Sequence, residues 1–289
     1  MVTQATQSGV DPVAADADHQ LRFGGTQRLY GKSLTEYYRQ AQVIVVGIGG
    51  VGSWVAEALA RTAIGRITLI DLDDICISNV NRQIHATSSS IGQMKVEAMA
   101  ARLRDINPYC QVVTQAAFIQ ASNIAELIPD DADYVVDAID NVRDKAALVA
   151  WCKRRKIPVI TIGGAGGQTD PTQVNVTDLT RTSQDPLAAK LRSVLKRHHG
   201  FSKTDKFGID CVYSTEQLRY PQADGSVCHR KPDTGGSARL DCAGGFGAAT
   251  CVTATFGFVA VARLLKKMEA RFVRQLAADS NAIKTEVTG

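Results

Sequence analysis

The sequence predicts an α/β fold: a Rossmann-like, mostly parallel sheet with helices on both faces, extended by antiparallel strands and a basic C-terminal segment. Three observations lead to this prediction. Short apolar runs alternate with helical patterns, glycines follow the first run directly, and acidic residues follow two of the later runs. Together these features are typical of parallel βαβ units that bind a nucleotide.

Composition is consistent with one core domain. The 289 residues are 45% hydrophobic, and the formal net charge of +4 does not by itself imply a nucleic-acid partner. We expect a flexible tail at 1–20, a single nucleotide-binding domain at 21–270 with a basic, partly mobile segment at about 180–240, and a C-terminal tail at 271–289. The first residues lack the basic start and apolar core of a signal peptide.

The cysteines indicate a reducing compartment. All seven are scattered and none form a CxxC pair, so the sequence predicts neither a zinc knuckle nor a disulfide framework, and we expect a cytoplasmic protein.

The stretch 242–262 has no charged residue, and its length permits a membrane span. Because it is rich in Gly and Thr, we favour a buried helix and expect no stable membrane insertion.

The segment 22–31 precedes a short helix predicted at 34–40. We expect it to lie across the sheet edge or to reach a partner subunit. Arg22 and Arg28 within it are candidates either for surface ion pairs or for phosphate contacts.

The stretch 43–71 organises the chain. An apolar strand at 43–46 leads into a glycine-rich turn, a helical pattern at 53–63, and a second strand at 67–70 that ends in Asp71. The turn contains Gly47, Gly49, Gly50 and Gly52. We expect the first glycine to permit the tight turn, the second to let a phosphate approach the backbone, and the last to let the helix pack closely. The alternative is a turn that serves packing alone.

Polar residues are dense directly after Asp71, where ligands of open α/β sheets bind. These are Asp73, Asn79, Asn81, Arg82 and Gln83. A site for a triphosphate needs such a cluster, whereas a dinucleotide dehydrogenase does not. Arg82 offers a planar fork suited to phosphate.

Lys95 lies in the first turn of a helix predicted at 93–106, where the helix dipole disfavours a cation. We therefore expect Lys95 to pair with phosphate. The alternative is a solvated surface lysine.

The next predicted elements are a strand at 111–114, a short helix at 124–128 and a strand at 134–141. The last strand carries Asp137, Ala138, Asp140 and Asn141, on the same side of the sheet as the glycine turn. A carboxylate there is suited to hold Mg²⁺ on ATP phosphates. Alternatively, Asp140 or Asn141 caps the helix predicted at 142–155.

A buried strand at 157–162 ends in a second glycine loop, and an antiparallel edge strand is predicted at 173–177. The region 190–206 is the most basic part of the chain and includes Lys203 and Lys206. Such a run is either a solvated face or a loop that contacts a phosphate backbone. An amphipathic helix is predicted at 259–273.

These residues identify a family. The motifs GIGGVGSW, DLDDICISNVNRQ and DAIDN, together with Lys95, resemble the ubiquitin-activating-enzyme-like (ThiF/MoeB/HesA-type) adenylating superfamily. The stretches RFGGTQRLYG, GGAGGQTDPTQ, QDPLAAKLR and FGAATCVTATFGF resemble its branch of tRNA threonylcarbamoyladenosine dehydratases.

The resemblance implies an ATP- and Mg²⁺-dependent ring closure on tRNA, in which the threonine carboxylate is adenylated and then attacked. It implies catalytic roles for Arg82, Lys95 and Asp140, with Asp140 also the metal ligand, and a ribose contact for Asp71. The expected nucleotide-binding set is Gly47, Gly49, Gly50, Gly52, Asp71, Asp73, Asn79, Asn81, Arg82, Gln83, Lys95, Asp137, Ala138, Asp140, Asn141 and Arg22.

The resemblance also implies partners: the tRNA substrate and a second copy in a homodimer. A sulfur-transfer protein is a further candidate partner. In many relatives an arginine reaches the partner's ATP site, but Gly25 stands near that position, so Arg22 or Arg28 would have to replace it. Cys242 is the better candidate for a thiol relay, although a buried inert thiol is the simpler interpretation.

Three rival functions remain. An activator of a ubiquitin-like sulfur carrier shares the adenylation step, but the missing CxxC pairs and the basic segment count against it. An NAD-dependent oxidoreductase explains the glycine turn and Asp71 but gives no task to Arg82, Lys95 or Asp140. A non-catalytic tRNA- or membrane-binding protein explains only the basic loop and the uncharged stretch.

Overall fold

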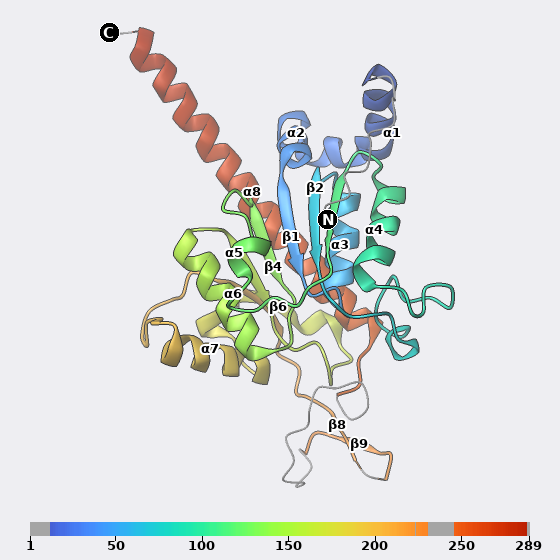
Figure 1. Cartoon of the computed structure of the whole chain (residues 1–289). Coiled ribbons are helices and arrows are strands. Elements are labelled where there is room, and N and C mark those ends of the chain that lie inside the picture. Colours follow the sequence, from blue (N-terminus) through green and yellow to red (C-terminus); the bar gives the residue numbers. More distant parts are fainter. Residues whose placement is uncertain (1–11, 223, 231–245, 288–289) are drawn as a thin grey trace.

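A seven-stranded sheet forms the centre of the chain. The computed structural model describes residues 12–222, 224–230 and 246–287. The strands are β1 (Gln42–Val46), β2 (Arg66–Ile70), β3 (Gln111–Gln115), β4 (Tyr134–Asp137), β5 (Val159–Ile162), β6 (Val174–Asp178) and β7 (Asp210–Ser214). Their order is β3-β2-β1-β4-β5-β7-β6 (Figure 1). Each neighbouring pair from β3 to β7 is parallel, and β6 runs antiparallel to β7.

A short antiparallel hairpin, β8 (Tyr220–Pro221) with β9 (Val227–Cys228), lies apart from the main sheet. The predicted fold class is therefore confirmed.

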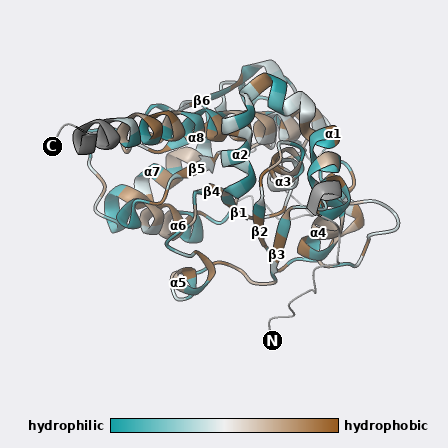
Figure 2. Cartoon of the chain, turned by 90° about the horizontal axis from the view of Figure 1, so that it is seen from above, coloured by the Kyte–Doolittle hydropathy of each residue, from teal (hydrophilic) through white to brown (hydrophobic). Residues whose placement is uncertain are grey.

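Helices cover both faces of the sheet (Figure 2). They are α1 (Pro12–Tyr30), α2 (Lys32–Gln40), α3 (Gly52–Arg61), α4 (Lys95–Ile106), α5 (Ile124–Leu127), α6 (Val142–Arg155), α7 (Pro186–His198) and α8 (Thr250–Val287), with 3-10 turns at Ile77–Asn79, Pro171–Gln173 and Leu179–Arg181. One apolar cluster joins α2, α3, α4 and α8 to one face, and a second joins α5, α6 and α7 to the other.

Strand β1 contributes to both apolar clusters. Val43 and Val45 belong to the cluster under α3, and Ile44 and Val46 belong to the cluster under α6. Successive side chains of a strand point to opposite faces, so a strand covered on both faces is apolar throughout. Because the inner strands are parallel, their carboxyl ends meet at one edge, where the loops after β1, β2, β4 and β5 emerge.

In the loop from β1 to α3, backbone atoms approach so closely that no side chain fits between them. A Cβ atom on Gly52 would lie 1.8 Å from the carbonyl oxygen of Gly47, and a Cβ on Gly47 would lie 2.8 Å from that of Ala138. Gly47 also has φ of +86°, which favours glycine. The last glycine of the motif thus packs α3 against the loop itself rather than against the sheet.

A buried ion pair fixes the loop from β4 to α6. Lys145 is 0% exposed, and its Nζ lies 3.0 Å from Oδ2 of Asp137. The same ammonium donates to the carbonyl oxygens of Asp137 (3.2 Å) and Ile139 (2.9 Å). The Thr161 hydroxyl donates to Asp137 Oδ2 at 2.6 Å. Every polar contact here is internal, so these side chains hold the loop in one conformation.

Helix α8 packs across α3 and then extends away from the rest of the chain (Figure 1). At the crossing, a Cβ on Gly257 would lie 2.9 Å from Cβ of Trp54. Val252, Phe256 and Ala260 are fully buried, so the helix that begins at Thr250 packs one face against the core, as predicted for this stretch. Among the described residues, no helix has both the length and the apolar character needed to cross a bilayer.

Three predictions about elements need correction. Residues 12–20 are helical in α1 rather than a flexible tail, and residues 271–287 continue α8; positions 1–11 and 288–289 lie outside the described residues. Strand β4 ends at Asp137 instead of reaching Asn141, because Lys145 draws the following carbonyl groups into a loop. Within the described part of 180–240, α7 and the buried strand β7 pack into the core, and the partial mobility of this segment stays a prediction.

Replacing Gly52 by Ala is expected to destabilise the fold by about 1–3 kcal/mol, because the new methyl group meets a backbone oxygen that cannot swing away. Urea unfolding measures this. Gly49→Ala is the matched control, because a Cβ there meets nothing within 4 Å. Equal midpoints for the two variants would show that the close approach is not required.

Replacing Lys145 by Met is expected to cost about 3–5 kcal/mol of unfolding free energy, because it leaves the Asp137 carboxylate buried without its partner. Adding Asp137→Asn should recover part of this stability. Lys153→Met, an exposed position on the same helix, is the control for removing a lysine. If Lys145→Met and Lys153→Met unfold alike, the ion pair does not support the loop.

Candidate active site

The glycine loop borders open space at the carboxyl edge of the sheet. Gly47 N–H donates to the carbonyl of Ile70 at 2.9 Å, which ties the loop to β2. A Cβ atom on Gly49 would meet no atom within 4 Å. The loop is therefore rigid at Gly47 and Gly52 and open between them, as the approach of a phosphate requires.

Asp71 joins this loop to the end of β2. Its Oδ2 accepts a hydrogen bond from Ile48 N–H at 2.6 Å and its Oδ1 accepts one from Asp73 N–H at 2.9 Å. Burial raises the pKa of Asp71, while these backbone donors and the nearby Lys95 oppose the shift. Each oxygen keeps a further lone pair for a ribose hydroxyl, and that contact stays a prediction.

Lys95 is the first residue of α4 and is only 6% exposed. Its Nζ lies 2.6 Å from Oδ2 of Asp73, whose side chain is 52% exposed. This carboxylate offsets the unfavourable position of a cation at a helix N-terminus. The Lys95 side chain is therefore buried and ends beside Asp73, just after β2. It is not the solvated surface lysine that was the alternative prediction.

Arg82 lies over the glycine loop. A Cβ on Gly50 would lie 3.3 Å from Cδ of Arg82, so the aliphatic stem covers that glycine. Its Nη1 donates to the Ser78 carbonyl at 2.8 Å and to Asn81 Oδ1 at 3.1 Å. Its own carbonyl accepts from Trp54 Nε1 at 3.0 Å, which connects the loop to α3.

Three further amide side chains belong to this segment, and two of them hold its backbone in place. Asn79 is 3% exposed, and its Oδ1 accepts from Cys76 N–H at 3.0 Å. Asn81 Nδ2 donates to the carbonyl of Ala248 at 3.3 Å, which ties the segment to the residues before α8. Gln83 is 4% exposed, and its Oε1 has no partner among the described residues.

Asp140 and its neighbours complete the edge. Ala138 N–H donates to the carbonyl of Val46 at 2.8 Å, which places the loop after β4 directly against the glycine loop. Asp140 is exposed and makes no hydrogen bond or ion pair with a described residue. Asn141 accepts from the N–H groups of Arg143 (3.0 Å) and Asp144 (3.3 Å), so it is the cap of α6.

Two predicted nucleotide ligands are placed elsewhere. Asp137 is 0% exposed and points into the ion pair with Lys145, so it does not face a ligand at the edge. Arg22 pairs with Asp18 at 2.6 Å, and Asp18 accepts from the hydroxyl of Tyr109, which precedes β3. Arg22 thus lies near the amino ends of the strands, away from its own chain's glycine loop.

Sequence reasoning missed two buried polar groups near the loop. Within the described part of the chain, the buried hydroxyl of Ser53, in the first turn of α3, has no partner. The same holds for both ring nitrogens of His85, which is 4% exposed. Burial, with the charges of Lys95 and Arg102, lowers the pKa of His85 to about 4, so the ring is neutral at pH 7. No spacing or periodicity in the sequence marked either residue.

The donor set fits a nucleotide with a weakly held divalent ion. No group of three or more His, Cys, Asp or Glu residues lies together anywhere in the described part of the chain. Mg²⁺ in nucleotide sites commonly takes one or two carboxylates, with phosphates and water as the other ligands. The exposed carboxylate of Asp140 beside the glycine loop suits that arrangement.

Comparison with known proteins agrees with this geometry. The model of the ThiF family matches residues 25–285. The tRNA threonylcarbamoyladenosine dehydratase of Escherichia coli K12 is 58% identical over 265 residues, which is 91% of this chain and 98% of that protein. The molybdopterin-synthase adenylyltransferase of the same organism is 33% identical over 126 residues, covering 44% of this chain and 50% of that protein.

Among solved structures, the E. coli tRNA N6-threonylcarbamoyladenosine dehydratase in complex with ATP superposes with a TM-score of 0.79 at 54% identity. The match covers 89% of this chain and 97% of that one. Similarity therefore extends over the whole core, including both glycine loops and α8. The chain belongs to the ThiF family, within its branch of tRNA threonylcarbamoyladenosine dehydratases.

Proposed function

We propose that the chain uses ATP to dehydrate threonylcarbamoyladenosine in tRNA, next to the anticodon, and so closes a ring on the modified base. One observation carries this proposal: two cations and an uncommitted carboxylate come from three segments at the carboxyl edge of the sheet, where the glycine loop is open. They are Arg82 in the segment after β2, Lys95 at the start of α4 and Asp140 in the loop after β4. The name of the E. coli relative supports the substrate, and its ATP complex supports the nucleotide.

The chemistry has two steps. A carboxylate oxygen of the threonyl group attacks the α-phosphorus of ATP, the bond to the bridging oxygen breaks, and pyrophosphate leaves. The carbamoyl group then attacks the activated acyl carbon, loses a proton and expels AMP with the electron pair of the broken bond. In net terms, one water is removed from the substrate while ATP becomes AMP and pyrophosphate.

The side chains at the edge suit the first step. Negative charge grows on the departing pyrophosphate, and fixed cations stabilise it without reorganisation at the moment of reaction. Arg82 is held over Gly50 by its hydrogen bonds to Ser78 and Asn81. Lys95 reaches a phosphate by exchanging the Asp73 carboxylate for it.

Mg²⁺ would be held by Asp140 and the phosphates, and when bound it would neutralise phosphate charge. The exposed carboxylate, which pairs with no described residue, supports this role, and the buried ion pair of Asp137 leaves Asp140 as the acid at this loop.

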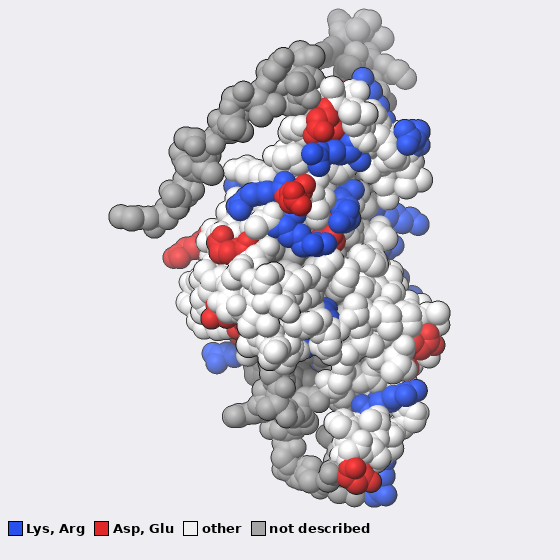
Figure 3. Space-filling model, turned by 90° about the vertical axis from the view of Figure 1, so that its right-hand side faces the viewer, with Lys and Arg blue, Asp and Glu red and all other residues white. Residues whose placement is uncertain are grey.

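A basic cavity on α7 and the loop after it supports contact with tRNA. The cavity of about 550 Å³ is lined by Ser193, Lys196, Arg197 and Lys203. No ion pair joins these cations to a described acidic residue. On the face formed by α1 and α4, by contrast, Lys and Arg mix with acids (Figure 3). In α1, for example, Arg22 pairs with Asp18. An unneutralised group of cations is better suited to a phosphate backbone.

A homodimer is the expected assembly. Ile77, Val80 and Phe258 are 75%, 50% and 48% exposed, and Ile77 and Val80 lie in the loop that carries Arg82. Apolar surface of this kind suits a second copy of the chain. Arg22 or Arg28 would then act in the partner's site, because α1 lies away from its own glycine loop.

Incubating the protein with ATP, Mg²⁺ and tRNA that bears threonylcarbamoyladenosine, followed by mass spectrometry of the nucleosides, tests the proposal. We expect a product lighter by one water. Pyrophosphate exchange stimulated by a sulfur-carrier tail and not by this tRNA would favour the rival activator instead.

Asp140→Asn is expected to reduce product formation by about a hundredfold, because it removes the charge that holds the metal beside the phosphates. The unfolding midpoint should not change, since Asp140 makes no hydrogen bond or ion pair with a described residue. Asp144→Asn, a carboxylate in the first turn of α6, is the matched control. Normal turnover of Asp140→Asn at every Mg²⁺ concentration would reject the metal role.

Replacing Lys203 and Lys206 together by Ala is expected to weaken tRNA binding. The slope of log K against log salt concentration should decrease in magnitude by about one for each phosphate contact that is lost. Binding measured over a salt series gives both quantities. The double variant Lys32→Ala with Lys266→Ala removes the same charge from exposed positions elsewhere. Equal slopes for the two variants would exclude the basic loop as an RNA-binding element.

A further inference from the structure

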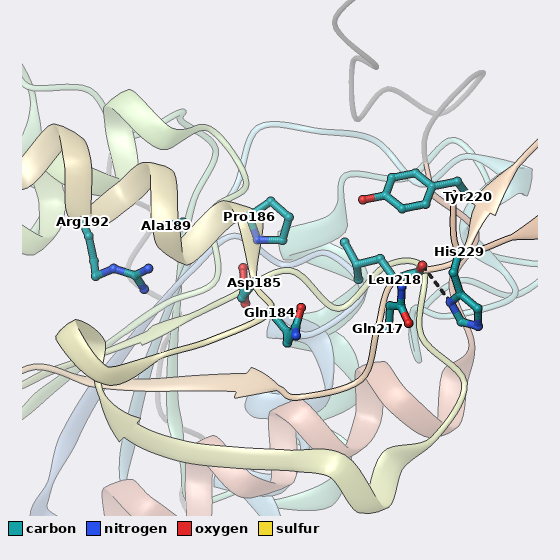
Figure 4. A pocket seen from close by; sticks show the side chains of 9 residues that line it. All are labelled: Gln184, Asp185, Pro186, Ala189, Arg192, Gln217, Leu218, Tyr220 and His229. Atoms are coloured by element: carbon teal, nitrogen blue, oxygen red, sulfur yellow. Dashed lines mark hydrogen bonds between the residues drawn. The ribbon is translucent and has the colours of Figure 1, made fainter. Parts of the chain in front are cut away.

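A second cavity, of about 370 Å³, lies between the start of α7 and the segment around the β8–β9 hairpin. Its lining includes Gln184, Pro186, Arg192, Gln217, Tyr220 and His229 (Figure 4). None of these residues takes part in the nucleotide site at the glycine loop. The cavity combines an aromatic ring, an imidazole, a guanidinium and two amides.

The cavity is connected to the nucleotide edge through Asp185. This residue caps α7, where its Oδ1 accepts from Ala188 N–H at 2.9 Å. Its Oδ2 accepts from Gly164 N–H at 3.0 Å, in the loop directly after β5. Strand β5 is the neighbour of β4, which ends in the loop of Asp140. Asp185 of the cavity is therefore bonded to the loop after β5, which neighbours the loop of Asp140 at the carboxyl edge of the sheet.

The aromatic wall is supported from behind. The ring of Tyr220 lies 5.2 Å from that of Phe246, centroid to centroid, with an interplanar angle of 55°. Figure 4 shows the Tyr220 ring directed toward Pro186 across the cavity. The Nδ1 of His229 is 3.1 Å from the carbonyl of Leu218, so its Nε2 remains for another partner. A supported ring of this kind is a stacking platform for a flat ligand.

Polar groups of the lining remain open for a ligand. The side-chain amides of Gln184 and Gln217 make no hydrogen bond with a described residue. Gln184 has φ of +56°, a conformation that non-glycine residues rarely adopt and that is often found at ligand sites. Arg192 is anchored through Nη1 to the carbonyls of Leu179 (3.3 Å) and Thr182 (3.2 Å) and to the Thr182 hydroxyl, which leaves its other nitrogens as donors.

We propose that this cavity binds an unstacked nucleobase of the tRNA anticodon loop. The inference rests on the proposed function and adds a second contact point for the same substrate. Sequence-specific proteins recognise single-stranded RNA by stacking splayed bases on aromatic rings and by hydrogen bonding to their edges. Tyr220 supplies the ring, and the amides of Gln184 and Gln217 supply both donors and acceptors.

The charge of the cavity favours a base over a phosphate. One cation, Arg192, is accompanied by the buried carboxylate of Asp185, which would repel an anion. The cavity of Ser193, Lys196, Arg197 and Lys203 has three cations and no acid among its described lining residues, and it is the better site for a phosphate. The two cavities thus fit two different parts of an RNA strand.

The test is the affinity of full-length variants for an anticodon stem-loop RNA that contains threonylcarbamoyladenosine, followed by fluorescence anisotropy. Tyr220→Ala should weaken binding about tenfold, because one base is left without its stacking partner. Tyr220→Phe keeps the ring and should bind within about twofold of the unchanged protein. The affinity for ATP, measured by calorimetry, should stay the same in both.

Tyr109→Ala is the matched control, since Tyr109 precedes β3 at the amino ends of the strands, where its hydroxyl donates to Asp18. Unchanged RNA affinity in Tyr220→Ala would overturn the assignment, and so would an equal decrease in Tyr220→Ala and Tyr220→Phe. If the unchanged protein yields no cyclic product but Tyr220→Ala still binds the RNA more weakly, the proposed function fails and the base site stands.

Discussion

The contact between Gly52 and the carbonyl of Gly47 is the constraint on which the rest of the site depends. It sets where α3 begins, and hence where the positive end of the helix dipole points. A side chain at Gly52 would occupy the space of a backbone oxygen. With this contact in place, the loop passes below Arg82 and against Ala138, and three loops meet at one edge.

Polar side chains at this edge divide into two sets. One set holds the backbone: Asp71 fixes the glycine loop, Asn141 caps α6, and Asp137 is enclosed with Lys145. The other set is available to a ligand: Asp140 pairs with no described residue, and Lys95 is held by a partly exposed acid that it can exchange. Asp71, Asp137 and Asp140 are all acids at or just after strand ends, yet only their partners distinguish the two roles.

The sequence was sufficient to predict the βαβ core, because strands covered on both faces are continuously apolar and the glycine spacing leaves few alternatives. Helix 142–155 was predicted at its observed bounds, since Asn141 is a strong cap. The burial of the Asp137 side chain was not foreseen, because its partner Lys145 lies eight residues further along the chain. His85 and the cavity at Tyr220 were not foreseen, because long-range packing creates both. Cys242, the candidate for a thiol relay, lies outside the described residues.

The ion pair of Lys145 has a consequence for ligand affinity. By donating to two carbonyl groups of the same loop, the ammonium fixes the backbone that precedes Asp140 when the protein folds. The entropic cost of ordering that loop is therefore part of the free energy of folding, and it does not reduce the free energy of nucleotide binding. The backbone that carries this carboxylate is thus preorganised before any ligand arrives.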